Sequence, residues 1–437
     1  MANGAEGFEK TVKIECLTRV EGEGGIYVRA EGGELRDVKL NIFEPPRFFE
    51  AFLRGRHFQE VPDIVARICG FCPVAYQMSA VHALEAALGV RPGAEIRMLR
   101  RLLYCGEWIE SHALHIYLLN APDYLGYESA VALAADHPKE VERGLRLKKI
   151  GNELLDLLGG RATHPVSVCV GGFYKAPRRK DLEKLRDDLV WALDAAQETV
   201  SFVAGLKFPE FAPDYEFVSV AHPAEYPMNE RRIISSSGLN IDPAEFEQVF
   251  LEEHVAHSTA LHSVRADRGS SYFVGPLARL NLNFDKLLPR AQAAARSCGI
   301  AWPCHNPFMG IVARAVELVH ACEEALALID AYQEPARSRV DFRVQAGEGC
   351  AATEAPRGLL YHRYRINDQG LVEAAKIIPP TAQNMRRIED DLRQFLPGFL
   401  AQPESEIARA SENLVRCYDP CISCSTHFLK LKLDRGE

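Results

Sequence analysis

Two Cys-x-x-Cys pairs stand near opposite ends of this 437-residue chain, and they constrain its fold more than any other feature. The first pair is Cys69 and Cys72, and the second is Cys421 and Cys424, with His427 three positions further on. At this spacing, one helical turn or tight loop can aim both sulfurs of a pair at the same ion. If the pairs meet, the fold must join distant segments around a buried site. The sequence therefore predicts a container for metal.

The composition is that of an ordinary globular protein, with 47% hydrophobic and 25% charged residues. A formal net charge of −9 argues against a nucleic-acid-binding surface, so no nucleic-acid partner is expected. No uncharged apolar stretch reaches the about 18 residues that a membrane span requires, and the first residues carry no apolar signal segment. We therefore expect a cytoplasmic protein without a membrane span.

Hydrophobic patterning predicts an α+β fold with a central bundle of long helices and peripheral antiparallel strands. Residues 11–43 alternate apolar and polar positions between glycine-rich breaks, which is typical of an antiparallel meander. Residues 61–335 are expected to form the helical core, because apolar residues recur there at helical spacing with few interior breakers. The long helices are expected near 141–158, 182–206 and 291–332.

The C-terminal part, 340–427, is expected to hold a β hairpin and the metal-binding segment. The hairpin should pair 359–366 with 371–378 across a four-residue turn, and a further β-like piece is expected at 340–344. No repeat, low-complexity tract or linker divides the chain. We therefore expect a single catalytic body rather than separate domains.

Three kinds of site stay open from the residues alone. A structural zinc site fits the motif, although its pairs usually lie about 15–20 residues apart and a large core needs no zinc staple. An iron–sulfur cluster also takes four cysteines. A soft transition metal with redox chemistry is the third choice, because thiolates are its natural ligands.

Two carboxylates accompany these pairs. Glu50 lies inside the strongly apolar run 48–53, where a carboxylate needs a cation or a hydrogen-bond donor. Glu21 stands beside glycines at a strand end, which by itself is typical of a surface turn.

The motifs along the chain resemble those of one enzyme family. Arg67-Ile-Cys-Gly-Phe-Cys-Pro73 and Asp419-Pro-Cys-Ile-Ser-Cys-Ser-Thr-His427 are similar to the two metal-binding motifs of the nickel–iron hydrogenase large subunit. Further matching motifs follow in the family's order: Leu17 to Gly22, Gly160 to Pro165, Gly171-Gly172, His305 to Pro307, Ala313 to Glu317 and Glu354 to Gly358. The related large subunit of respiratory complex I lacks the four cysteines, which argues against that branch.

The resemblance implies a nickel–iron centre on the four cysteines. Cys69, Cys72, Cys421 and Cys424 would bind nickel, and Cys72 and Cys424 would bridge to an iron that carries cyanide and carbon monoxide ligands. Hydrogen would be split or formed heterolytically there, with Cys421 or a nearby group taking the proton. Glu21 matches the carboxylate that relays the proton outward.

Other residues match the surroundings of that centre. Arg357 corresponds to the guanidinium over the open site and Asp419 to an acid beside it, while Thr381 would donate a hydrogen bond to a cyanide. Two positions depart from the family. Pro380 stands where many members have serine, and Tyr76 stands where many have a histidine that hydrogen-bonds a bridging sulfur.

The resemblance also implies a second metal and a processed tail. Glu50, His427 and a backbone carbonyl near Ile377 would bind magnesium or another hard divalent ion, with water completing the shell. Residues 428–437 resemble the extension that a maturation protease removes after the histidine.

Electrons need a route away from the site, and no other cysteine cluster here could hold an iron–sulfur relay. An iron–sulfur small subunit is therefore expected as a partner. The chain looks most similar to the cytoplasmic sulfhydrogenase-type branch, in which electron-transfer and flavin diaphorase subunits reduce NADP or NAD. The alternatives are a viologen-reducing or heterodisulfide-reductase-linked hydrogenase, or a non-catalytic hydrogen sensor or zinc-stapled scaffold.

Overall fold

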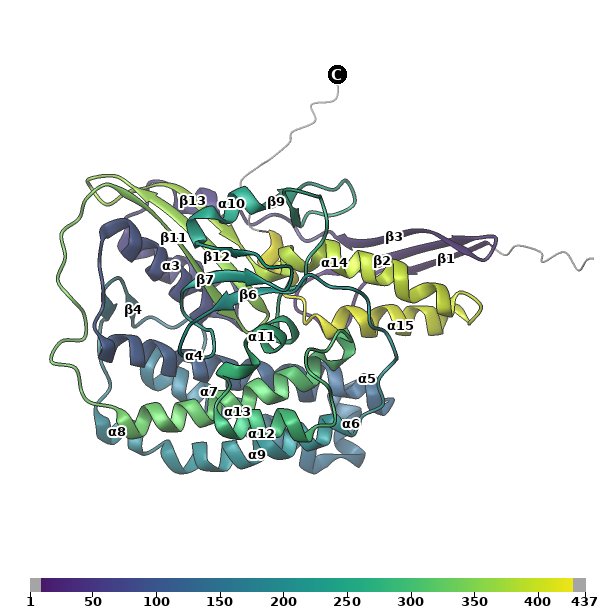
Figure 1. Cartoon of the computed structure of the whole chain (residues 1–437), viewed down its shortest axis with the longest axis horizontal. Helices are drawn as coiled ribbons and strands as arrows, with labels where there is room; N and C mark the ends of the chain where they lie inside the picture. Colours follow the sequence, from purple (N-terminus) through teal and green to yellow (C-terminus); the bar gives the residue numbers. More distant parts are fainter. Residues whose placement is uncertain (1–8, 427–437) are drawn as a thin grey trace, which may run out of the picture.

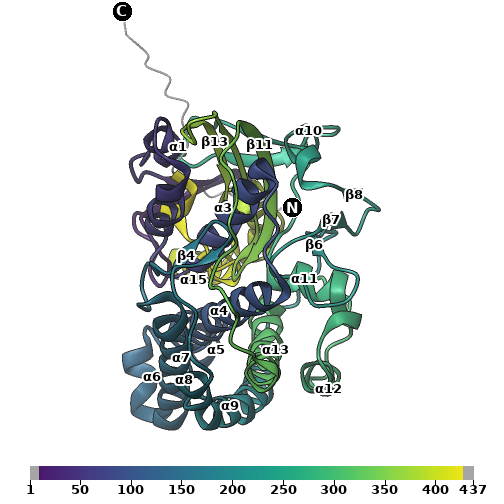
Figure 2. The ribbon, with the colours of Figure 1, turned by 90° about the vertical axis from the view of Figure 1, so that its left-hand side faces the viewer.

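Helices and strands occupy two layers in the computed structural model, which describes residues 9–426 (Figure 1). Long helices form the lower layer of the view, and the larger sheets lie above them. Figure 2 shows the same division after a quarter turn, with α7, α9 and α13 below β11 and β13. The lower layer contains α4 (Ala94–Leu114), α5 (Ala121–Leu125), α6 (Ala130–Asp136), α7 (Pro138–Gly159), α8 (Arg179–Glu183), α9 (Arg186–Ala204), α12 (Pro289–Ser297) and α13 (Gly310–Ala331).

Helix α4 is the centre of the helical layer. It packs against α7 and α13, and every side chain from Leu99 to Ala113 is buried. Glycines let two of these helices touch backbone to backbone, because a β-carbon on Gly151 of α7 would lie 2.6 Å from the carbonyl oxygen of Gly106 in α4. Helix α7 then ends at Gly160, whose φ of 84° is a left-handed conformation that glycine adopts without strain.

The upper layer is built from small antiparallel sheets. The N-terminal sheet extends away from the body at the right of Figure 1 and corresponds to the expected meander. The sheets, in strand order, are β1 (Glu9–Ile14), β2 (Gly24–Glu31) and β3 (Glu34–Ile42); β4 (Val168–Cys169) and β5 (Gly172–Phe173); β6 (Val218–Ala221), β7 (Arg232–Ser235) and β8 (Asn240–Ile241); β9 (Phe250–Glu253) and β10 (His262–Arg265); and β11 (Gly347–Ala355), β12 (Gly358–Ile366) and β13 (Val372–Ile378).

The remaining helices connect the sheets to the helical layer. Helix α3 lies along β11 and β12, α14 packs against β3 and β10, and α15 packs against β1. Their bounds are α1 (Phe49–Leu53), α2 (Val61–Val65), α3 (Pro73–Leu88), α10 (Phe246–Val249), α11 (Pro276–Asn283), α14 (Pro380–Phe395) and α15 (Glu404–Cys417). No helix within residues 9–426 is long and apolar enough to cross a membrane.

Two expectations about secondary structure were wrong. Residues 340–344 belong to no strand, and the hairpin β12–β13 is extended by β11 into a three-stranded sheet. Strand β11 escaped prediction because it is rich in glycine and alanine. These residues are small for a packing reason, since a β-carbon on Gly349 would lie 2.2 Å from the carbonyl oxygen of Ala83 in α3. The expected helical core at 61–335 is likewise interrupted by strands β4 to β10.

The close contact of α4 and α7 generates a stability prediction. Gly151→Ala forces the added methyl group into the backbone of α4, and overpacking of this kind costs about 1–3 kcal/mol. We expect a lower thermal unfolding midpoint, measured by circular dichroism. Gly398→Ala is the matched control, because a β-carbon there meets nothing within 4 Å. Equal midpoints for the two variants would contradict the tight packing of α4 on α7.

Candidate metal centre

The two cysteine pairs lie where helices begin and end. Cys69 follows a 3₁₀ turn at Ala66–Ile68, and Cys72 immediately precedes α3, whose first residue is Pro73. Proline suits that position because the first helical amide needs no partner. After α15 the chain turns at Asp419, whose φ of 52° is left-handed, and Pro420 prevents the helix from resuming. The 3₁₀ turn Ile422–Thr426 then presents the second pair.

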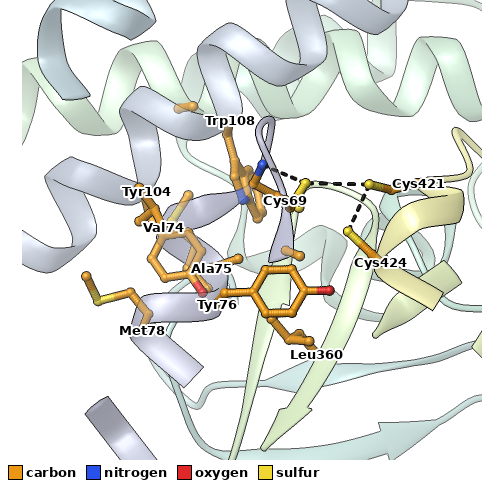
Figure 3. Packing of buried hydrophobic residues seen from close by; sticks show 14 of the residues in the cluster. Cys69, Val74, Ala75, Tyr76, Met78, Tyr104, Trp108, Leu360, Cys421 and Cys424 are labelled. Atoms are coloured by element: carbon orange, nitrogen blue, oxygen red, sulfur yellow. Dashed lines mark hydrogen bonds between the residues drawn. The ribbon is translucent and has the colours of Figure 1, made fainter. Parts of the chain in front are cut away.

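The four thiols meet in one buried cluster, as Figure 3 shows for three of them. The sulfur of Cys69 lies 2.9 Å from that of Cys72 and 3.5 Å from that of Cys421, which lies 2.9 Å from that of Cys424. Each residue is at most 3% exposed, and all four are free thiols. The geometry suits a soft metal ion, because four sulfurs converge without forming disulfides.

Ionisation within the cluster is uneven. Burial opposes ionisation of Cys69, but hydrogen bonds from Cys421, Cys424 and Cys72, with the nearby Arg357 guanidinium, hold its pKa well below the usual thiol range. Burial raises the pKa of Cys421 and of Cys424. A hydrogen bond with Cys421 lowers the pKa of Cys72, but Cys424, Cys69 and burial together raise it well above the usual range. A metal that binds as a thiolate complex must therefore displace protons.

Glu21 contacts the second cysteine pair directly. Its Oε2 accepts hydrogen bonds from the Cys421 thiol at 2.9 Å and from the Ser423 amide at 3.1 Å. The Ile422 amide also donates to the Glu21 carbonyl, and a parallel bridge joins Glu21 to Cys421, 400 positions away in the chain. Glu21 is only partly buried, so its carboxylate links the innermost sulfur to a more exposed region.

A buried guanidinium and carboxylate lie on another side of the sulfurs. Arg357 donates to the carbonyl oxygen of Asp419 at 2.8 Å and to its Oδ1 at 3.1 Å, and Arg314 lies 4.0 Å from its Oδ2. Burial would raise the pKa of Asp419, but Arg357, His115 and Arg314 lower it, so the carboxyl stays ionised. Within residues 9–426, Nη1 of Arg357 and Oδ2 of Asp419 have no hydrogen-bond partner.

Thr381 and Tyr76 complete the polar surroundings. The hydroxyl of Thr381, at the start of α14, accepts a hydrogen bond from the Cys421 amide at 3.0 Å, which leaves its own proton free to donate. Tyr76 points from α3 towards Cys424 in Figure 3, and its buried hydroxyl has no hydrogen-bond partner in the described part of the chain. Buried donors of this kind usually have acceptors. The free donors of Tyr76 and Arg357 therefore suit a centre that brings polar ligands or thiolates.

The residues expected at the hard-ion site are only partly described. Glu50 is 3% exposed, and its Oε1 accepts a hydrogen bond from the Ile377 amide at 3.0 Å. This contact uses the amide of Ile377, whereas the sequence predicted its carbonyl as a ligand. Lys376 lies 3.7 Å from the same oxygen, yet burial outweighs both contacts and raises the pKa of Glu50. His427 lies outside the described residues.

Two important residues escaped the sequence reasoning. Arg47 donates to the carbonyl of Ile68 at 2.7 Å and also to the carbonyl of Ser423, so one guanidinium joins the loops that carry both cysteine pairs. Nothing in its local sequence signals this role. Glu107 of α4 accepts hydrogen bonds from the first amides of α3, with the Val74 amide at 2.6 Å. Its signal was an acid inside an apolar run, the same sign that singled out Glu50.

Comparison with known proteins supplies an independent test. The family model described as nickel-dependent hydrogenase matches residues 47–144 and 268–427. The alpha chain of sulfhydrogenase 1 from Pyrococcus furiosus is 36% identical over 424 residues, which cover 96% of this chain and 98% of the relative. The corresponding vhc F420-non-reducing hydrogenase chain from Methanococcus voltae is 28% identical over 95% of this chain and 94% of its own length.

A solved structure shares the whole architecture. The NAD+-reducing [NiFe]-hydrogenase in its H2-reduced state superposes with a TM-score of 0.86 at 26% identity, covering 96% of this chain and 99% of the other. This match confirms the predicted α+β fold of long helices with antiparallel strands.

The contact between Thr381 and Cys421 generates a second prediction. Thr381→Val removes the acceptor and leaves the buried Cys421 amide unpaired, which costs about 1–3 kcal/mol. We expect a lower thermal unfolding midpoint for the metal-free chain, measured by differential scanning fluorimetry. Thr381→Ser keeps the hydroxyl and should melt closer to the unchanged chain. A valine variant as stable as the serine variant would show that this bond contributes nothing.

Proposed function

The chain belongs to the nickel-dependent hydrogenase family as a catalytic large subunit, and on this basis we propose that Cys69, Cys72, Cys421 and Cys424 hold its nickel–iron centre. The single observation that carries this proposal is the convergence of the four thiols, with sulfur separations of 2.9–3.5 Å. When bound, the centre supplies the polarisation that splits or forms H2. The iron would carry cyanide and carbon monoxide ligands, and Cys72 and Cys424 would bridge the two metals.

We assign the outward movement of the proton to Cys421 and Glu21. A sulfur to carboxylate separation of 2.9 Å is within the reach that direct proton transfer requires. The Ser423 amide holds Oε2 of Glu21 in place, so the acceptor does not have to move to meet the thiol. The partial exposure of Glu21 gives the proton a next step towards water.

Arg357, Asp419 and Thr381 would shape the polar side of the centre. Asp419 fixes the Arg357 guanidinium through two hydrogen bonds, so its Nη1, which has no partner within residues 9–426, has a defined direction in which to meet a polar ligand. The free hydroxyl proton of Thr381 could serve a cyanide in the same way. The Tyr76 hydroxyl would serve a bridging sulfur in place of the family's usual histidine.

The hard-ion site and the tail are further parts of this proposal. Glu50 would bind magnesium together with His427 and the carbonyl of Ile377. Its deep burial supports a cation partner, because an isolated buried carboxylate is costly. Residues 428–437 would be removed by a maturation protease.

An iron–sulfur small subunit would receive the electrons. Among the described cysteines, only the proposed centre gathers into a metal-binding group, which leaves no relay in this part of the chain. Electron-transfer and flavin subunits in the cytoplasm would then reduce NADP or NAD. The likeness to a sulfhydrogenase alpha chain and to an NAD+-reducing hydrogenase supports this acceptor. The likeness to F420-non-reducing hydrogenases keeps a heterodisulfide-linked enzyme as the second candidate.

Metal analysis of a cysteine variant tests the proposed centre. Cys72→Ser should abolish both H2 turnover and the infrared bands of cyanide and carbon monoxide, because a bridging ligand is lost. Cys298→Ser is the control, since Cys298 stands outside the cluster and donates to the carbonyl of Ala295, as serine also can. Full nickel and iron content with unchanged bands in Cys72→Ser would overturn the assignment. In the unchanged complex, H2-dependent reduction of NADP or NAD separates the two electron acceptors.

The role of Glu21 can be separated from metal loading. Glu21→Gln keeps a hydrogen-bonding side chain but cannot take a proton, so we expect H2 turnover to fall about 100- to 10,000-fold. Nickel and iron content should stay unchanged. Glu23→Gln, two residues further along the same loop and exposed, should retain activity. Full activity in Glu21→Gln would exclude this carboxylate from the proton route.

A further inference from the structure

We propose that His257, His262 and Glu389 form a second transition-metal site, separate from the cysteine centre and suited to a divalent ion of the Zn²⁺ class. His257 lies in the loop between β9 and β10, His262 begins β10, and Glu389 comes from α14. The site therefore joins a histidine and a carboxylate that are 132 positions apart in the chain. Two imidazoles and one carboxylate are a donor set typical of zinc.

The geometry places one ligand atom from each residue in a common space. These three atoms all lie within 4.8 Å of one another. Nε2 of His257 is 2.6 Å from Oε1 of Glu389, and the rings of His257 and His262 are 5.8 Å apart at an angle of 83°. An ion placed between them would need only small side-chain shifts to reach all three.

His262 is the residue that most needs a ligand. It is 1% exposed, and neither of its ring nitrogens has a hydrogen-bond partner among the described residues. Buried imidazoles normally have partners, because leaving a polar group unpaired costs free energy. Burial also lowers the pKa of His262 to about 4, so the ring is neutral at physiological pH and keeps a lone pair for a metal.

Glu389 is already oriented by its neighbours. Its Oε1 accepts a hydrogen bond from the Leu40 amide at 3.0 Å, and its Oε2 accepts one from Arg393 at 3.1 Å. Such outer contacts fix the direction of a ligating carboxylate and are common around metal sites. Arg386 and Arg393 also face His262, and their positive charge disfavours a charged imidazolium there.

A metal at this position would join three parts of the upper layer. The β9–β10 loop already contacts β3, where the Thr259 amide donates to the carbonyl of Ile42 at 2.7 Å. Helix α14 begins beside Thr381, which holds the Cys421 amide. An ion bound by His257, His262 and Glu389 would thus fix the helix that supports one side of the cysteine centre. Its role is structural, because three protein ligands tie loop, strand and helix together.

Zinc binding to the full chain tests this site. The four cysteines of the proposed centre are replaced by serine, so that added Zn²⁺ cannot bind there, and binding is measured by isothermal titration calorimetry. We expect one Zn²⁺ per chain and a higher thermal unfolding midpoint in its presence. Adding His262→Ala should weaken binding by more than the about 10- to 100-fold that loss of an outer-shell partner costs.

The matched control is His137→Ala in the same background. His137 lies 3.9 Å from Glu140 on the helical layer, but no second imidazole among the described residues joins that pair. Zinc affinity should be unchanged in this variant. Absence of stoichiometric binding, or equal affinity in the His262 and His137 variants, would overturn the proposal.

X-ray absorption at the zinc edge covers the case in which His262→Ala fails to fold. In the nickel-loaded complex the cysteines are occupied, so zinc at the proposed site should show a shell of nitrogen and oxygen with imidazole scattering. A sulfur-containing shell, or no retained zinc after dialysis against the free ion, would count against the site. This measurement does not depend on hydrogenase turnover, so the site and the catalytic assignment can fail separately.

Discussion

The contact of two chain ends through buried hydrogen bonds is the constraint on which this structure depends. Arg47 donates to carbonyls in both cysteine loops, and Glu21 binds the second loop through its backbone and its carboxylate. These bonds are formed in a water-excluded interior, where an unpaired group is costly. The sulfurs can therefore be held close together by the surrounding chain before any metal contributes.

Charge balance follows from the same burial. The Arg357 guanidinium is surrounded by the Asp419 carboxylate and by sulfurs, and Arg314 adds a second positive charge nearby. Deeply buried cations remain charged only when anions accompany them. The protein thus provides fixed positive charge on one side of the cluster, while Glu21 provides a partly exposed carboxylate on the other. This asymmetry separates the side suited to polar ligands from the side suited to proton exit.

Sequence reasoning predicted the fold class and the family because both depend on local signals. The four cysteines lie in compact motifs, and the long helices show their period directly; the family matches confirm the hydrogenase assignment. The roles of the individual site residues stay predictions. Arg47 and β11 could not be found in this way, because each is defined by a distant partner: Ser423 for the arginine and α3 for the glycines of the strand. His262 was missed because a lone histidine carries no sign of its burial.

The separation of the two cysteine loops also orders events during synthesis. Cys69 and Cys421 are 352 positions apart, so at about 5–20 residues per second the ribosome makes the second pair roughly 20–70 seconds after the first. Helices α3 and α4 and most of the helical layer are complete in that interval. The first pair must therefore wait in a nearly finished body whose last wall is still being translated. A cell has this window in which to keep two reactive thiols from oxidation or from the wrong metal.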